Sequence, residues 1–206
     1  MNYSPKISVD RAVTIFDEMV GCRRYAYSDQ EFFKMSDYLK ELCRVESDGE
    51  ECPFRIKTFK TNPKEDFKRK VGVIEFGESV IFSMDERFLT KADQGCYLCN
   101  YIIAHEIGHL ALRHHEKNAK ILNFQLTKGQ SGYANLPPTV EELEANYAAV
   151  FFQCGIALFD DTYTSQQLAR LACSDPSYVK KAQKMVRLER FQELRRNKPR
   201  SPRVIL

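Results

Sequence analysis

Residues 101–113 impose the strongest constraint on the fold, because they form a predicted helix that is apolar on almost every side. They read Tyr-Ile-Ile-Ala-His-Glu-Ile-Gly-His-Leu-Ala-Leu-Arg. A helix of this kind has no face suited to water and is buried within its own protein. The two histidines and the glutamate inside it need partners there, since an unpaired polar group in a core is costly. The rest of the chain must therefore surround this helix and supply those partners.

The three polar residues have the spacing of an H-E-x-x-H motif, His105-Glu106-Ile107-Gly108-His109. On a helix, His105 and His109 share one face, so both rings can bind one zinc ion about 2.0–2.1 Å from each nitrogen. Glu106 is rotated by about 100° from His105, which suits a base that takes a proton from metal-bound water. Three fixed residues recur by accident in on the order of one in a hundred chains of this size. A pair of hydrogen-bonded core histidines is therefore the alternative interpretation.

One source of a third ligand is the metzincin pattern H-E-x-x-H-x-x-G-x-x-H, whose last position is His115 in this sequence. The glycine that ends the helix in that pattern is replaced here by Leu112. If the helix continues past Leu112, His115 lies about 240° around the axis from His109 and faces away from the ion. The metzincin alternative therefore depends on a helix that breaks near Leu112.

A glutamate from the next predicted helix, which starts after Thr139 and ends near Gly155, is the other source. Its candidates are Glu141, Glu142 and Glu144. Thr139 and Glu142 form a T-x-x-E capping box, which gives Glu142 a structural role. On a helical wheel, Glu144 lies about 70° from the centre of the apolar stripe, and the other two lie about 130° away. Glu144 is the innermost carboxylate, and we predict it as the third ligand, with a surface glutamate as the alternative.

The patterns along the chain predict an α+β fold with one small antiparallel sheet. Capping residues and apolar periodicity divide the chain into helices and strands. We expect residues 1–160 to form a zinc metallopeptidase-like domain and residues 161–206 a helical C-terminal segment with a basic tail. The predicted helices cover 8–20, 28–45, 93–117, 139–155, 165–172 and 179–196, the predicted strands 54–59, 71–76 and 79–84, and a long loop 118–138.

Composition bears on compartment and partners. Seven cysteines, with no secretory signal in the sequence given, indicate free thiols in a reducing cytoplasm. No apolar run is long enough to form a membrane-spanning helix, so we expect no membrane partner. Cys96 and Cys99 form a lone C-x-x-C, which we interpret as structural thiols. Residues 180–206 carry ten Lys or Arg and two Glu, so the net charge of +3 leaves −5 for the other 179 residues. This basic end is either a solvated helix and tail or a contact for nucleic acid.

The two motifs together resemble the ImmA/IrrE family of bacterial zinc metallopeptidases. Residues 104–112 match the family's A-H-E-[LI]-G-H-x-x-L helix, and residues 144–149 resemble its E-A-N-x-F-A helix. The resemblance covers roughly residues 70–155. It implies a zincin-like, gluzincin-type fold, in which the H-E-x-x-H helix and a second ligand-bearing helix pack on a small sheet. It further implies one zinc ion per chain held by His105, His109 and Glu144, with Glu106 as the catalytic base.

The leading hypothesis is a zinc-dependent endopeptidase of the cytoplasm. The resemblance implies that its substrate is a protein, typically a helix-turn-helix transcriptional repressor. We expect a substrate strand along the edge of the sheet that contains residues 80–84, and Tyr133 and His115 are candidates for stabilising the oxyanion. The alternatives are a zinc-containing regulatory or binding module without turnover, or a DNA-binding regulator that acts through the basic C-terminal helix.

Overall fold

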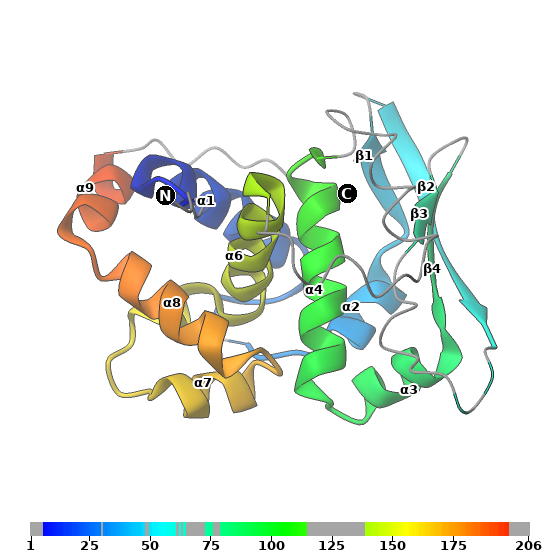
Figure 1. Cartoon of the computed structure of the whole chain (residues 1–206). Helices are drawn as coiled ribbons and strands as arrows, with labels where there is room; N and C mark the ends of the chain where they lie inside the picture. Colours follow the sequence, from blue (N-terminus) through cyan, green and yellow to red (C-terminus); the bar gives the residue numbers. More distant parts are fainter. Residues whose placement is uncertain are drawn as a thin grey trace, which may run out of the picture.

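A computed structural model describes residues 6–29, 31–47, 50–60, 62, 64, 73–75, 79–114 and 139–197 of the chain. The architecture is α+β, as predicted: helices come first, a small sheet follows, and further helices complete the chain (Figure 1). The elements are α1 (Val9–Ala26), α2 (Met35–Glu41), β1 (Arg44–Ser47), β2 (Glu50–Phe59), β3 (Val73–Glu75), β4 (Val80–Asp85), α3 (Glu86–Asp93), α4 (Tyr97–Ala111), α6 (Val140–Cys154), η3 (Gly155–Phe159), α7 (Ser165–Leu171), α8 (Pro176–Val186) and α9 (Glu189–Asn197).

The sheet is mixed, and the prediction of a purely antiparallel sheet is wrong. Its strand order is β1-β2-β4-β3. The β3–β4 hairpin pairs antiparallel as expected, but β4 also pairs with β2 in parallel, with Phe54 opposite Val80. The sequence pattern of a hairpin predicts only that β3 and β4 pair with each other. The strand that pairs with the other edge of β4 depends on the path of the whole chain. As a result, β4 lies inside the sheet, and its hydrogen-bonding groups already have two neighbouring strands.

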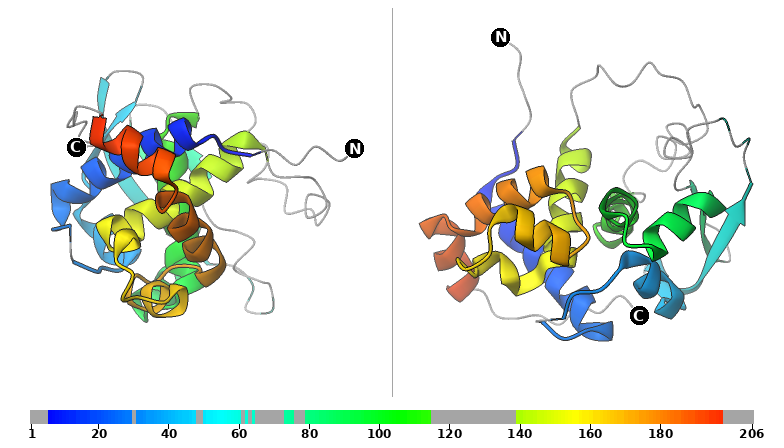
Figure 2. Two further views of the ribbon diagram at one scale, coloured as in Figure 1. Left: turned by 90° about the vertical axis from the view of Figure 1, so that its left-hand side faces the viewer. Right: turned by 90° about the horizontal axis from the view of Figure 1, so that it is seen from below.

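Helix α4 is the centre of the molecule. It lies between the sheet on one side and helices α1 and α6 on the other, in both Figure 1 and the view from below in Figure 2. Ile103, Ile107 and Leu110 are buried, which confirms the prediction that this helix is enclosed. Gly108 permits the close approach of α6, because a Cβ atom at this position would lie 2.9 Å from the Cβ atom of Ala148.

Helix α6 has the start and end that its sequence predicts. Thr139 is the N-cap, and its hydroxyl accepts a hydrogen bond from the backbone N–H of Glu142. Gly155 follows the last turn with φ of +53°, a conformation that glycine adopts at little cost.

Three other helix boundaries differ from the predictions. Helix α1 runs through Gly21 to Ala26, because Cys22 and Arg23 continue its buried face and tertiary packing outweighs the roughly 1 kcal/mol cost of one glycine. The expected helix 28–45 is only α2, followed by β1. Within the expected helix 93–117, α4 covers Tyr97–Ala111, and residues 115–117 lie outside the described part.

Helix α4 ends at Ala111, earlier than predicted. Leu112 is its C-cap, and Arg113 has φ of +54°, so the chain turns away from the helix axis there. His115 and the predicted loop 118–138 lie outside the described residues. The prediction that His115 faces away from the site assumed that the helix continues past Leu112. Because α4 ends at Ala111, that assumption is wrong.

The C-terminal helices pack on the rest of the molecule. Asp175 caps α8, with Pro176 in its first turn, as predicted. The predicted helix 179–196 is divided into α8 and α9. Phe191 of α9 is fully buried, and its ring makes an edge contact with Phe16 of α1 at 5.8 Å between centroids. The C-terminal segment thus shares the hydrophobic core of α1, while residues 198–206 of the basic tail lie outside the described part.

Across the described residues, no helix has both the length and the apolar character needed to cross a membrane.

Candidate metal centre

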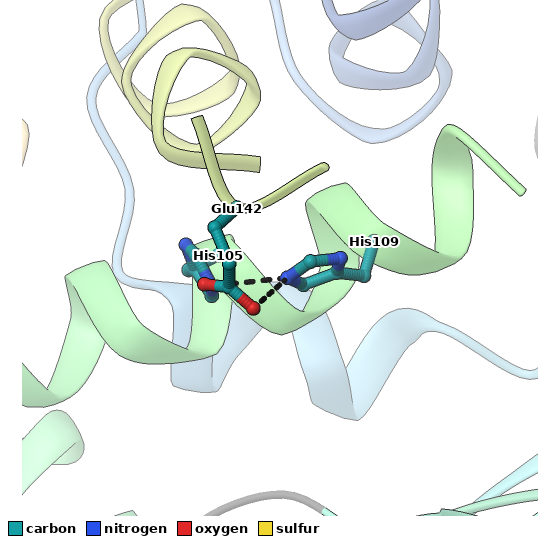
Figure 3. A group of neighbouring side chains, drawn as sticks. All are labelled: His105, His109 and Glu142. Atoms are coloured by element: carbon teal, nitrogen blue, oxygen red, sulfur yellow. Dashed lines mark hydrogen bonds and ion pairs between the residues drawn. The ribbon is translucent and has the colours of Figure 1, made fainter. Parts of the chain in front are cut away.

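Helices α4 and α6 bring three potential metal donors to one point. His105 and His109 occupy one face of α4, and their Nε2 atoms lie 3.1 Å apart. A carboxylate from the first turn of α6, Glu142, faces both rings (Figure 3). Its two oxygens lie 3.2 Å from His105 Nε2 and 3.5 Å from His109 Nε2. Among the described residues, this is the only group of three or more such donors close enough to share an ion.

The spacing of these donors suits a tetrahedral ion. Two ligand atoms that are each 2.0–2.1 Å from a tetrahedral zinc lie about 3.3–3.4 Å from each other. The three observed separations, 3.1, 3.2 and 3.5 Å, bracket that value. Two ring nitrogens at 3.1 Å also need a proton or a cation between them, because two lone pairs at that distance repel. Two imidazoles and one carboxylate are the donor set of many catalytic zinc sites.

Glu106 follows His105 on the same helix and is half-buried. Burial raises the pKa of its carboxyl group, and the nearby rings of His105 and His109 oppose that rise without cancelling it. A carboxylate with a raised pKa binds a proton more strongly than a free one, which is the property that a general base needs. The structure thus places Glu106 beside the donors, where the motif predicts it.

The ionisation of Glu142 is strongly favoured. Its contacts with the rings of His105 and His109 hold the pKa of this carboxyl group far below its usual range, against the effect of burial. At His105, burial acts to lower the pKa, but the hydrogen bond with Glu142 outweighs it, and the net shift is upward. The carboxyl group of Glu142 is therefore ionised, as a metal ligand requires.

Glu144, the carboxylate predicted as third ligand, is not brought to the two histidines. It is the most buried of the three glutamates, with 7% of its surface exposed, which confirms the helical-wheel ranking. Its carboxylate accepts two hydrogen bonds from Arg11, at 2.8 and 2.6 Å, and lies 3.0 Å from His114 Nε2. The helical wheel predicts how deeply each carboxylate is buried. Which carboxylate contacts His105 and His109 depends instead on how α4 packs against α6.

The local environment keeps Glu144 ionised. Burial raises the pKa of its carboxyl group, but the hydrogen bonds from Arg11 and His114 outweigh burial and lower the pKa overall. Sequence reasoning missed both partners. No local pattern marks Arg11, which is 133 positions away from Glu144.

An aromatic pair lies next to the donors. The hydroxyl of Tyr101 donates to Oδ1 of Asn146 on α6, and its ring stacks on Tyr178 of α8 at 5.3 Å. Burial raises the pKa of both hydroxyls, so both are neutral donors near neutral pH. The oxyanion candidates from the sequence, Tyr133 and His115, lie outside the described residues.

The C-x-x-C pair is separate from this group. Cys99 is buried and Cys96 is half-buried at the N-terminus of α4.

Comparisons with protein-family models, with curated proteins and with solved structures found no match for this chain.

Proposed function

We propose that this protein is a zinc-dependent peptidase whose metal is held by His105, His109 and Glu142. The observation that carries the proposal is the convergence of these three donors at separations near those of a tetrahedral ion, with the carboxylate of Glu106 on the same turn. We propose Glu142 in place of Glu144 because Glu142 alone of the two carboxylates contacts both histidines.

A zinc ion in this site would polarise the scissile carbonyl and acidify a water molecule. The chain's own residues supply the remaining steps. Glu106 accepts the proton of the attacking water on its carboxylate and then donates that proton to the leaving nitrogen. Glu142 and the two histidines hold the reacting centre in place. Tyr101 and Asn146, hydrogen-bonded to each other, form part of the wall beside His105.

The nature of the substrate follows from the resemblance to the ImmA/IrrE family. We propose a zincin-like peptidase acting in the cytoplasm on a protein, with a helix-turn-helix repressor as the first substrate to test. The proposed docking of a substrate strand on residues 80–84 is withdrawn, because β4 lies between β2 and β3. Among the described strands, β1 and β3 form the two edges of the sheet and are the edges available in its place.

Metal analysis of the purified protein tests the site. We expect about one zinc per chain, and we expect it to be lost in His105→Ala and in His109→Ala, because each variant removes one donor. Full zinc occupancy in both variants would refute the site.

Glu106→Gln separates peptidase activity from metal binding. The amide has nearly the same shape but cannot accept the proton from water, so zinc content should be unchanged while peptide hydrolysis falls by at least 100-fold, roughly the contribution of a general base. The assay is cleavage of a casein-derived or repressor substrate, measured with the zinc-loaded protein. Equal rates for the variant and the wild type would favour the alternative function, a zinc-containing binding module.

A further inference from the structure

A chain of hydrogen bonds runs from helix α1 to the outer nitrogen of His109. Arg11 donates from Nε and Nη2 to the two oxygens of Glu144, at 2.8 and 2.6 Å. Oε2 of Glu144 lies 3.0 Å from Nε2 of His114. Nδ1 of His114 lies 2.8 Å from Nδ1 of His109. Four residues from three parts of the chain are thus connected in series, and the last of them is a proposed zinc ligand.

Arg11 and Glu144, at one end of this series of hydrogen bonds, have fixed donor and acceptor roles, and these roles determine the direction of the remaining bonds. A guanidinium group only donates, and an ionised carboxylate only accepts. His114 must therefore donate from Nε2 to Glu144. In the neutral ring of His114, Nδ1 is then bare and accepts, so His109 must donate from Nδ1. The neutral ring of His109 consequently has a bare Nε2, and this is the atom that faces His105 and Glu142.

Three of the four linked residues are enclosed, and Arg11, at the outer end, is partly exposed. His109, His114 and Glu144 are all buried. His114 reaches His109 because the backbone turns at Arg113, whose φ of +54° is a left-handed conformation that costs a non-glycine residue roughly 1–2 kcal/mol. A local strain of this kind persists where the surrounding contacts determine the geometry.

We propose that Arg11, Glu144 and His114 are positioning residues that hold His109 in the tautomer able to bind a metal ion. They act through His109 and do not contact the ion themselves. This inference rests on the proposed function for its consequence, zinc affinity, but the tautomer of His109 is a property of the metal-free protein. Partners of this kind behind a ligating histidine fix the tautomer and orientation of the ring.

His114→Leu tests the chain directly, because leucine offers no acceptor to His109. We expect zinc affinity, measured by competition with a chromophoric chelator, to fall about 10–100-fold. In the metal-free protein, ¹⁵N chemical shifts of the His109 ring should show the proton on Nδ1 in the wild type and distributed over both nitrogens in the variant. His114→Gln, whose amide can accept from His109 and donate to Glu144, should retain more affinity than His114→Leu.

Glu144→Gln is the second test, and Glu141→Gln is its control on the same helix with the same change in charge. The amide of Glu144→Gln leaves one acceptor oxygen for three N–H groups, so the chain should weaken and zinc affinity should fall, while Glu141→Gln should bind zinc as the wild type does. Unchanged affinity and an unchanged His109 tautomer in His114→Leu would overturn the proposal. Loss of zinc in Glu144→Gln with normal binding in His114→Leu would also overturn it, since Glu144 would then act on the ion directly.

Failure of this inference and failure of the proposed function have different signatures. A wild-type protein that binds no zinc contradicts the proposed function, and the ¹⁵N shifts of the metal-free protein still decide whether the chain holds the His109 tautomer. If the wild-type protein binds zinc and His114→Leu binds it with the same affinity, the proposed function stands. The proposed positioning role of Arg11, Glu144 and His114 is then wrong.

Discussion

Glu142 and Glu144 show how two carboxylates of one helix acquire different tasks. They are two positions apart, so their side chains leave α6 about 200° apart around its axis. Glu142 meets the histidines of α4, and Glu144 meets Arg11 of α1. We predict that Glu142→Ala lowers zinc affinity by more than 100-fold, because losing a ligand should exceed the 10–100-fold effect of an outer partner. Chelator competition measures the loss.

Glu141→Ala is the matched control for Glu142→Ala, one position away in the same turn of α6, and it should keep wild-type affinity. His115→Ala tests the metzincin alternative. Normal zinc binding in Glu142→Ala together with an empty site in His115→Ala would assign the third ligand to His115.

The contact between α4 and α6 depends on a glycine within the motif. A methyl group on Gly108 would lie 2.9 Å from the Cβ atom of Ala148 and 3.3 Å from the backbone oxygen of Ala145. We predict that Gly108→Ala destabilises the metal-free protein by about 1–3 kcal/mol through overpacking, although alanine favours a helix by about 1 kcal/mol over glycine. Urea unfolding followed by circular dichroism measures the change.

The double variant Gly108→Ala with Ala148→Gly is the control for this prediction. Removing the opposing methyl group should relieve part of the clash, and a double-mutant cycle should give a favourable coupling of about 0.5–3 kcal/mol between the two positions. A coupling of zero would show that α4 and α6 accommodate a methyl group at both positions without a clash.

At the scale of the whole molecule, the C-terminal segment is tied to the first helix through Phe191. Its buried ring contacts Phe16, Phe151 and Phe159. We predict that Phe191→Ala destabilises the protein by about 3–5 kcal/mol, the usual cost of removing a buried aromatic ring. Because the contacts join α9 to α1 and α6, unfolding in urea should remain one cooperative transition at a lower midpoint.

Leu188→Ala provides the comparison, since Leu188 is 45% exposed between α8 and α9 and should change stability by no more than about 0.5 kcal/mol. A Phe191→Ala variant that first loses only the signal of the C-terminal helices, and then unfolds at the wild-type midpoint, would show that residues 161–206 are an independent unit.

The sequence by itself determined the features that depend on local spacing. The apolar residues around the motif fixed the burial of α4, and the i,i+4 spacing put His105 and His109 on one face. Thr139 and Gly155 marked the ends of α6, and Asp175 with Pro176 marked the start of α8. Each of these depends on groups within one or two helical turns, which the sequence lists in order.

Only the tertiary structure decided the features that depend on how distant elements meet. The crossing of α4 and α6 brought Glu142, and not the more deeply buried Glu144, to the histidines. Packing of Cys22 and Arg23 carried α1 past Gly21, and the path of the chain placed β4 between β2 and β3. Arg11 and Glu144 are far apart in the chain, and no periodicity records such a contact, because it forms only where charge pairing in the folded protein offsets the cost of removing both groups from water.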